Sequence, residues 1–221
     1  MDGCWADACA IAATRIAGLD PVALREAITE YAHWWWSDPD RMRRGRLDLR
    51  KTTADIVGEV FRRLGYDDAD CATEVAMTYR DLREERATVF EGAVETIEWF
   101  RAQGVRLGMM TNGAAAAQRA KIERFDLERY FDHIIVEGEF GFGKPDRRVF
   151  ETLMTELRAE PANAWAVGDS LAGDVLPAIE MGMHGVWVDV RGDGLPEDAA
   201  GEPHRIIQRL TELHTGPSIP E

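Results

Sequence analysis

The chain has 221 residues, of which 45% are hydrophobic and 30% charged, and its formal net charge is -14. This length allows one sizeable domain or a core with a smaller second unit, and the composition is typical of a globular protein. The negative charge excludes general nucleic-acid binding, which needs a basic surface, but it allows a local cationic pocket for a small anionic substrate.

The sequence predicts neither membrane insertion nor secretion. No run approaches the roughly 18 apolar residues of a membrane span. Asp2, Asp7 and Arg15 interrupt the stretch where a signal peptide would be basic and then apolar. Cys4, Cys9 and Cys71 are odd in number and lack metal-ligand spacing, so we expect reduced thiols and a cytoplasmic protein with no membrane partner.

The first part of the chain, residues 1–88, is helical in pattern throughout. Pro21 after Asp20 is a typical helix start, and apolar residues recur at helical spacing from Ile56 to Leu64. No β-rich run interrupts this part, so the sequence predicts a small helical bundle. The expected helices are residues 5–18, 21–36, 52–64 and 70–86.

After residue 88, short apolar runs alternate with longer helical segments. This alternation is typical of βαβ units, and therefore of a parallel sheet covered on both faces. The sequence predicts an α/β domain over residues 89–221, with a turn-rich connector at 191–203 and a loose tail at 215–221. The expected strands are residues 105–110, 133–136, 164–167 and 186–190, and the expected helices are 91–103, 114–124, 147–158 and 171–182.

Parallel sheets bind ligands beyond the carboxyl ends of their strands, so the residues after each strand are the candidates for a site. The first run ends in Thr111, Asn112 and Gly113 and enters a helix at once. A hydroxyl, an amide and backbone N–H groups at a helix start suit the oxygens of a phosphate. Ordinary helix capping is the alternative interpretation.

The second run leads into a loop with Gly138, Gly141 and Gly143, followed by Lys144 and Pro145. Glycines let the backbone turn closely, and the proline constrains the entry into the next helix. A surface lysine is the alternative, but a cation is disfavoured beside a helix start. The loop therefore favours a lysine presented at the edge of the sheet.

The third run ends in Gly168 and Asp169, and Asp174 lies in the first turns of the next helix. Two carboxylates at one strand end repel each other unless they share a cation, and Mg²⁺ suits such oxygen ligands. A capping Asp169 with a solvated Asp174 is the alternative. Together, the three strand ends supply a hydroxyl, a cation and a metal seat for a phosphoryl group.

In this order the motifs resemble the haloacid dehalogenase superfamily of hydrolases, with Thr111-Asn112-Gly113, Lys144-Pro145 and Gly168-Asp169…Asp174 as its second, third and fourth motifs. The resemblance implies a Rossmann-like core with a helical cap inserted after the first strand. It implies that Thr111, with Asn112 and Gly113, binds the phosphoryl oxygens, and that Lys144 stabilises the nucleophile and the phosphate. It also implies that Asp169 ligates Mg²⁺ and that Asp174 completes the acidic site.

The acidic pair selects among the branches of that superfamily, because the resemblance implies that phosphatases keep both carboxylates and that metal-free dehalogenases do not. We therefore expect Mg²⁺-dependent hydrolysis of a small phosphorylated metabolite, such as a nucleotide or a sugar phosphate, through an aspartyl-phosphate. The catalytic candidates are Thr111, Asn112, Lys144 and Asp169. A 2-haloacid dehalogenase and a non-catalytic protein that binds phosphate and Mg²⁺ are the alternatives.

The superfamily's first motif, D-x-D-x-T at the end of the first strand, has no match in this chain. Asp2-Gly3 follows no apolar strand, Asp38-Pro39-Asp40 continues a helical pattern, and Asp48 to Thr52 has Arg50 in place of the second carboxylate. That strand would lie in the middle of the sheet, between the strands that end at Thr111 and Asp169. We expect an upstream segment of roughly 10–20 residues to carry this strand and the nucleophile, a length set by one strand and a turn.

Two segments of the first part carry unusual residues without a readable motif. Trp34, Trp35 and Trp36 cannot all face one side of a helix, so one or two are expected in the core and another near the cleft. Residues 41–51 are rich in arginine, either as a solvated face or as a cationic rim that steers a phosphorylated substrate. The histidines lack ligand spacing.

Overall fold

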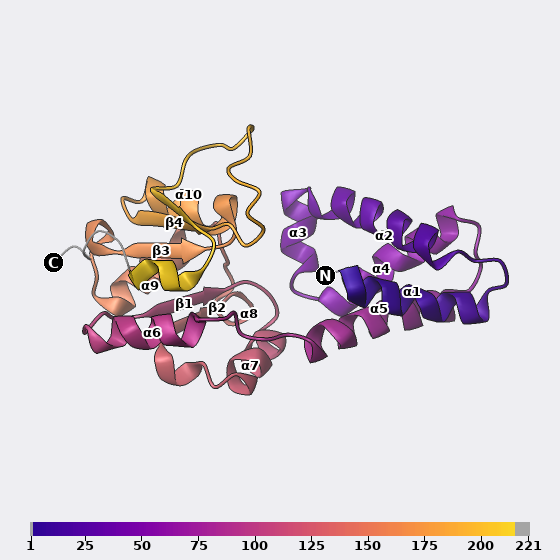
Figure 1. Ribbon diagram of the computed structural model, residues 1–221, viewed down its shortest axis with the longest axis horizontal. Coiled ribbons are helices and arrows are strands. Elements are labelled where there is room, and N and C mark those ends of the chain that lie inside the picture. The colour runs from indigo at the N-terminus through magenta and orange to yellow at the C-terminus, as the bar shows by residue number, and fades with distance from the viewer. Residues whose placement is uncertain (1, 215–221) are drawn as a thin grey trace. The chain divides into compact units, whose positions relative to one another are not determined.

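The computed structural model describes residues 2–214, so the expected loose tail at 215–221 lies outside the described residues. The chain divides into two compact units, with the boundary between Thr88 and Val89. We call them the helical unit and the α/β unit, and each is drawn in Figure 1. No helix within residues 2–214 combines the length and the apolar character needed to cross a membrane.

Aspartates begin most helices of the helical unit. Asp20, Asp38, Asp48 and Asp68 each accept a hydrogen bond from a backbone N–H group of the following first turn, which would otherwise lack a partner. Helix α3 was not expected, because its seven residues include too few apolar ones to show a period. The helices are α1 (Asp2–Arg15), α2 (Pro21–Trp36), α3 (Pro39–Gly45), α4 (Leu49–Arg63) and α5 (Ala69–Glu85).

One apolar cluster holds the helical unit together. Leu24, Ile28, Val57, Phe61 and Val75 are among its buried members and come from α2, α4 and α5. The burial of such side chains stabilises the fold by about 1.5–3 kcal/mol each.

The other expectations for this unit concern its cysteines and its tryptophans. Cys4, Cys9 and Cys71 are buried and form no disulfide, and burial raises the pKa of the Cys9 thiol to about 11. Trp35 and Trp36 pack against the apolar cluster, whereas Trp34 is 51% exposed.

The α/β unit contains parallel strands in two groups, β1-β2 and β3-β4-β5. The strands are β1 (Gly108–Thr111), β2 (His133–Val136), β3 (Trp165–Gly168), β4 (His184–Val188) and β5 (Arg205–Ile207). The α-helices are α6 (Ala93–Ala102), α7 (Ala115–Arg124), α8 (Glu137–Phe140), α9 (Arg147–Leu157) and α10 (Leu176–Glu180). Shorter helical turns are η1 (Glu128–Tyr130), η2 (Pro161–Asn163), the π-helical η3 (Leu171–Val175) and η4 (Leu210–His214).

Three expectations for this unit were wrong in their boundaries. The strand expected at 105–110 is β1, Gly108–Thr111, which begins three residues later. The strand expected at 186–190 is β4, His184–Val188, because its register pairs His184 with Trp165 and Gly168 with Trp187. Asp189 leaves the strand and accepts hydrogen bonds from the N–H groups of Gly192 and Gly194. The helix expected at 171–182 is the π-helical turn η3 followed by α10, and β5 was not expected.

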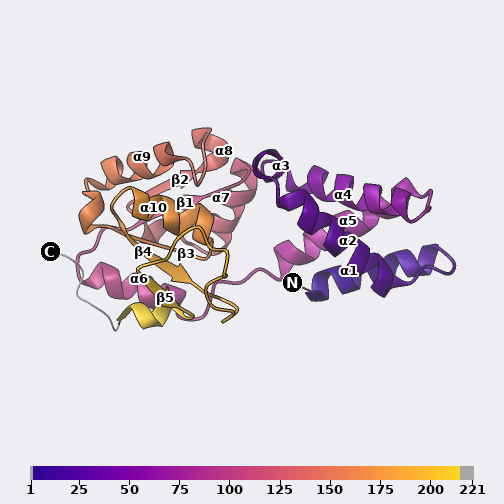
Figure 2. The ribbon, with the colours of Figure 1, turned by 90° about the horizontal axis from the view of Figure 1, so that it is seen from above.

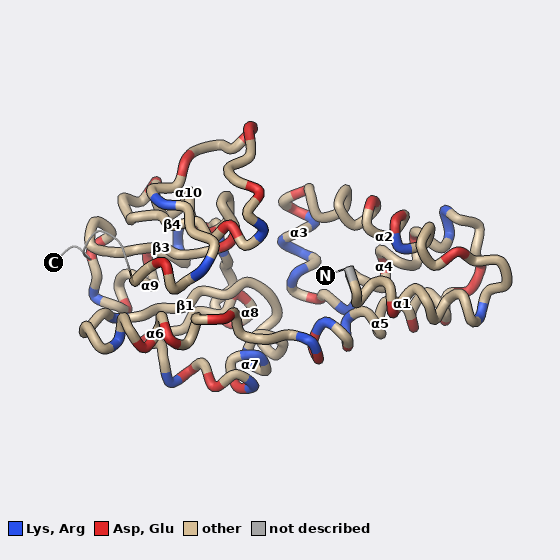
Figure 3. Tube along the Cα trace, in the orientation of Figure 1, with Lys and Arg blue, Asp and Glu red and all other residues tan. Residues whose placement is uncertain are grey.

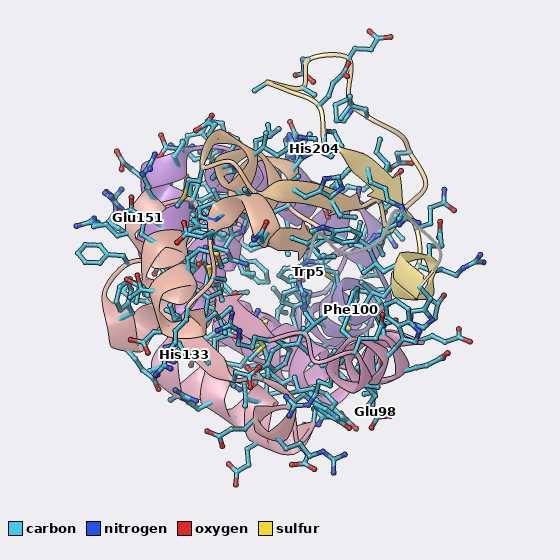
Figure 4. All side chains as sticks on the ribbon, turned by 90° about the vertical axis from the view of Figure 1, so that its left-hand side faces the viewer. Trp5, Glu98, Phe100, His133, Glu151 and His204 are labelled. Atoms are coloured by element: carbon cyan, nitrogen blue, oxygen red, sulfur yellow. The ribbon has the colours of Figure 1, made fainter. Side chains whose placement is uncertain are left out.

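Helices cover both faces of these strands. One apolar cluster contains Val149, Phe150 and Leu153 of α9 together with Ile135 of β2. On the other face, Phe100 of α6 packs against a cluster formed by Val186, Ile207 and Leu213. Figure 2 shows α9 and α6 on opposite sides of the strands, and Figure 4 shows Phe100 turned inward whereas Glu98 of the same helix lies at the outer rim.

Strands β1 and β3 differ from β4 in their burial. Within the described residues, β1 pairs with β2 alone and β3 with β4 alone, so each has one unpaired edge. All residues of β1 are partly exposed and Val167 of β3 is 40% exposed, whereas Gly185, Val186 and Trp187 of β4 are buried. Central strands of a covered parallel sheet are normally buried, so the exposure of β1 and β3 is that of strands with one open edge within residues 2–214.

Candidate functional site

The loop after β1 lies against the loop that follows α8. The Asn112 side chain donates from Nδ2 to the carbonyl of Lys144 at 2.7 Å, and its Oδ1 accepts from the Lys144 backbone N–H at 2.8 Å. This double hydrogen bond joins two loops that are far apart in the sequence. Asn112 therefore sets the position of Lys144. In the same loop, the hydroxyl of Thr111 donates to Oε1 of Gln118 at 3.1 Å.

Lys144 reaches from this loop to the end of β3. Its Nζ lies 2.7 Å from Oδ1 of Asp174, and the two side chains are only 18% and 13% exposed. Together with the Asn112 contacts, this pair brings together residues from all three expected strand ends. An ion pair sheltered from water is stronger than one at the surface, and it costs more to leave incomplete.

The segment after β3 places Asp174 against the end of that strand. Oδ2 of Asp174 accepts from the backbone N–H of Ser170 at 3.1 Å, and a Cβ added to Gly168 would overlap the Asp174 carboxylate. Glycine at this position is therefore required by the close approach of the side chain. Asp174 lies in the π-helical turn η3, a distortion that is frequent at functional sites.

Asp169 follows Gly168 directly and is exposed, and its carbonyl accepts a hydrogen bond from Nε1 of Trp187 at 3.0 Å. The strand end thus carries two carboxylates, an exposed one on Asp169 and a more buried one on Asp174. Such a pair fits Mg²⁺, which is commonly held by one or two carboxylates together with water and phosphate oxygens. Within residues 2–214, no three acidic, histidine or cysteine side chains converge as a complete metal cage.

Glu137, directly after β2, was missed by the sequence reasoning. It is 4% exposed, and its Oε2 accepts from the N–H of Gly113 at 2.8 Å. A Cβ on Gly143 would overlap the Glu137 carboxyl and Oδ1 of Asn112. Glu137 thus contacts both the loop after β1 and the loop after α8. Its position directly after a strand was the signal in the sequence that could have identified it.

The Gly113 N–H is occupied by Glu137 and the Thr111 hydroxyl by Gln118, so an anion would have to take the hydroxyl from Gln118 or bind the remaining backbone N–H groups of the loop. The prediction that Asn112 and Gly113 bind phosphate stays a prediction. In the structure, the Asn112 side chain is engaged with the Lys144 backbone.

The arginine-rich segment 41–51 lies in the helical unit, where Figure 3 shows its basic residues along α3 and the turn after it. Several of its charges have partners. Arg41 donates to the carbonyls of Trp34 and Trp35, and Lys51 pairs with Asp55 at 2.6 Å. These contacts favour the interpretation of a solvated face, and the expectation of a substrate-steering rim stays a prediction.

A family model for haloacid dehalogenase-like hydrolases matches residues 5–182 of the chain. The chain is 36% identical to a phosphoserine phosphatase of Thermus thermophilus over 114 residues, 51% of this chain and 45% of that protein. It is 31% identical to a rat N-acylneuraminate-9-phosphatase over 150 residues, 67% of this chain and 60% of that protein. The matches thus span about half of the length of these relatives.

Solved structures share the fold. A putative hydrolase of Bacillus subtilis, YfnB, described as bound to magnesium, superposes with a TM-score of 0.71 at 19% identity over 96% of this chain and 90% of that one. The L-2-haloacid dehalogenase RSc1362 superposes with a TM-score of 0.67 at 18% identity over 94% and 89% of the two chains. Both likenesses establish the α/β fold, which was expected from the sequence.

Proposed function

The chain belongs to the haloacid dehalogenase-like hydrolases, and we propose that its α/β unit holds the phosphate and the Mg²⁺ of a phosphatase for a small phosphorylated metabolite. The observation that carries this proposal is the sheltered ion pair of Lys144 and Asp174, 2.7 Å apart and joined to the Thr111 loop through Asn112. The relatives named as phosphatases of small metabolites support it.

Each proposed role follows from the chemistry of the side chain. The ammonium group of Lys144 neutralises charge that develops on the phosphoryl oxygens, and the hydroxyl of Thr111 donates a hydrogen bond to one of them. Asp169 and Asp174 hold Mg²⁺, which when bound supplies a positive charge to the phosphate oxygens. Asn112 and Glu137 act indirectly, because they position the loops that carry Lys144 and Thr111.

We propose further that a strand between β1 and β3 carries the nucleophilic aspartate, and that the helical unit serves as the cap. The unpaired edges of β1 and β3 and the exposure of Val167 support such a strand. Attack by an aspartate would form an aspartyl-phosphate, whose hydrolysis by water returns the carboxylate and releases phosphate. The genomic sequence that precedes the codon of Met1 tests this part directly: an apolar strand ending in D-x-D supports it, and an in-frame stop codon contradicts it.

The metal and phosphate roles can be tested on the chain itself. Titration calorimetry with MgCl₂ and with inorganic phosphate measures binding to the wild type and to Asp174→Asn. We expect Asp174→Asn to weaken Mg²⁺ binding by on the order of tenfold or more. The control is Glu180→Gln, an exposed acid at the end of α10, which we expect to leave binding unchanged. A wild type that binds neither ion contradicts the proposal.

Turnover is tested on a chain that includes the proposed strand. We expect this chain to release inorganic phosphate from members of a panel of nucleotides, sugar phosphates and phosphorylated acids, with Mg²⁺ but not with EDTA. Release of halide from 2-chloropropionate without Mg²⁺ would instead identify a dehalogenase. Binding of Mg²⁺ and phosphate without any turnover would identify a non-catalytic binding protein.

A further inference from the structure

The helical unit buries one charged side chain, Arg80 of α5, among its described residues. Arg80 is 9% exposed, and the other buried polar residues of this unit are Thr52 and Thr53. Both threonines have ordinary local partners, because their hydroxyls donate to the carbonyls of Gly45 and Leu49. Arg80 is therefore the one buried polar group of the described helical unit whose position needs a separate explanation.

Arg80 is incompletely paired. Its closest carboxylate is Oε1 of Glu84, 3.7 Å from Nη2, which is beyond hydrogen-bond distance. Glu84 is 46% exposed and also lies 3.4 Å from Nη2 of Arg50. The Nε–H group of Arg80 is fully buried and has no hydrogen-bond partner among the described residues. A guanidinium presents five N–H donors, so Arg80 retains capacity for a further acceptor.

The surroundings of Arg80 make this arrangement costly. Burial, followed by the charges of the nearby Arg83 and Arg50, lowers the pKa of Arg80. A guanidinium nevertheless stays protonated in proteins, so the charge remains. Arg50 donates hydrogen bonds to Asp81 and Glu84, and Arg83 donates to the hydroxyl of Tyr79. Burying a charge without a matching partner is unfavourable, and an anion would remove that cost.

We propose that Arg80 anchors a binding site for an oxyanion, a carboxylate or a phosphate group, within the helical unit. The planar guanidinium favours such anions, because two neighbouring N–H groups of one guanidinium can bind both oxygens of one group. Arg50 and Arg83 add positive charge around that position, and Glu84 is the carboxylate whose charge acts on Arg80. Arg80 belongs to the helical unit, whereas Lys144 and Thr111 belong to the α/β unit, and this proposal does not depend on the function proposed for them.

Nuclear magnetic resonance of the arginine Nε–Hε groups tests the site on the full chain. The signal of Arg80 is assigned by its loss in Arg80→Lys, and that of Arg83 by Arg83→Lys. Sodium phosphate and, in a second titration, sodium acetate are added at constant ionic strength set with sodium chloride. We expect a saturable shift of the Arg80 signal with at least one of the two anions and a smaller, linear shift for Arg83. An Arg80 signal that moves with neither anion overturns the proposal.

The same titration in Thr111→Val separates this site from the one in the α/β unit. We expect the shift of Arg80 to persist in that variant, whereas a shift lost with Thr111→Val would show that Arg80 only reports binding elsewhere and would overturn the proposal. A shift with phosphate alone identifies a phosphate site, and a shift with acetate as well identifies a general carboxylate site. A failed Mg²⁺ titration of the wild type would count against the proposed phosphatase and leave this result unaffected.

A stability measurement adds a second readout in the Thr111→Val background. We expect phosphate to raise the urea midpoint of this chain, and Arg80→Met to abolish that rise while Arg83→Met retains it. Methionine keeps much of the apolar stem that covers the core. If Arg80→Met responds to phosphate as strongly as its parent, Arg80 has only a packing role and the proposal is wrong.

Discussion

The helical unit pairs its charges mainly at the surface, whereas the α/β unit holds the Lys144–Asp174 pair inside. Lys51 and Asp55 of α4 lie 2.6 Å apart with side chains 69% and 58% exposed, and Lys144 and Asp174 lie 2.7 Å apart with side chains 18% and 13% exposed. The distances are nearly equal, so distance does not distinguish the two pairs. Exposure does, because water screens the first pair and must be removed from the second.

The difference in exposure indicates which charged residues have a role beyond solubility. An exposed pair on a helix contributes about 0.3–0.5 kcal/mol and can be lost without consequence. A sheltered pair is costly to break, because removing one partner leaves a buried charge without its counter-charge, as at the strand ends of the α/β unit. Arg80 is the exception in the helical unit, and its incomplete pairing is what makes it a candidate binding residue.

The largest expected effect is on the coupling between the two members of each pair. A double-mutant cycle with Lys144→Met and Asp174→Asn should give a coupling of about 2 kcal/mol in the free energy of unfolding. The matched cycle with Lys51→Met and Asp55→Asn should give about 0.4 kcal/mol, because that pair is exposed. Both are measured by urea denaturation, and equal couplings would contradict the role assigned to burial.

A smaller effect is expected at Glu137, with Glu139 two positions away as its control. Glu137→Ala leaves the buried Gly113 N–H without its acceptor, which should cost about 1.5 kcal/mol of stability. Glu139 pairs with Arg119 where both side chains are 40% exposed, so Glu139→Ala should cost less than about 1 kcal/mol.

Glu137→Gln keeps an oxygen acceptor for Gly113 and should recover part of the loss caused by Glu137→Ala. Urea denaturation gives the stabilities, and hydrogen exchange of the Gly113 amide reports the hydrogen bond itself. Unchanged exchange in Glu137→Ala would show that Glu137 does not hold this loop.

The smallest expected effect concerns pH and Asp146, the residue that caps α9. A side-chain hydrogen bond from Arg148, followed by one from the Arg148 backbone N–H, lowers the pKa of Asp146 to about 2. The folded-state pKa lies below the unfolded value of about 3.9, so the stabilisation is complete above about pH 4 and is lost as the pH falls toward 2.

Asp146→Asn keeps the cap acceptor and removes the titration. The stability difference between the wild type and this variant should therefore be less than about 1 kcal/mol near neutral pH, because solvent screens the partly exposed side chain, and should shrink between about pH 4 and pH 2. Thermal unfolding at several pH values measures it. A difference that stays constant over this range would exclude the ionised form of Asp146 as the source.

The sequence by itself determined what depends on neighbouring residues. Helical spacing, the aspartates before helices and the short apolar runs predicted most helices and strands to within a few residues, together with the α/β fold. The strand ends also drew attention to Thr111, Lys144, Asp169 and Asp174, because polar residues after apolar runs are visible in a linear chain.

Only the tertiary structure decided what depends on residues far apart. The pairing of His184 with Trp165 set the boundaries of β4, and the separation of β1-β2 from β3-β4-β5 left two strand edges unpaired. Which partner each polar group selects could not be predicted, as for Asn112 with the Lys144 backbone and Glu137 with Gly113. The partners are determined by side-chain packing and by the requirement that buried polar groups form hydrogen bonds. Neither can be read from a local sequence pattern, because both depend on residues far apart in the chain.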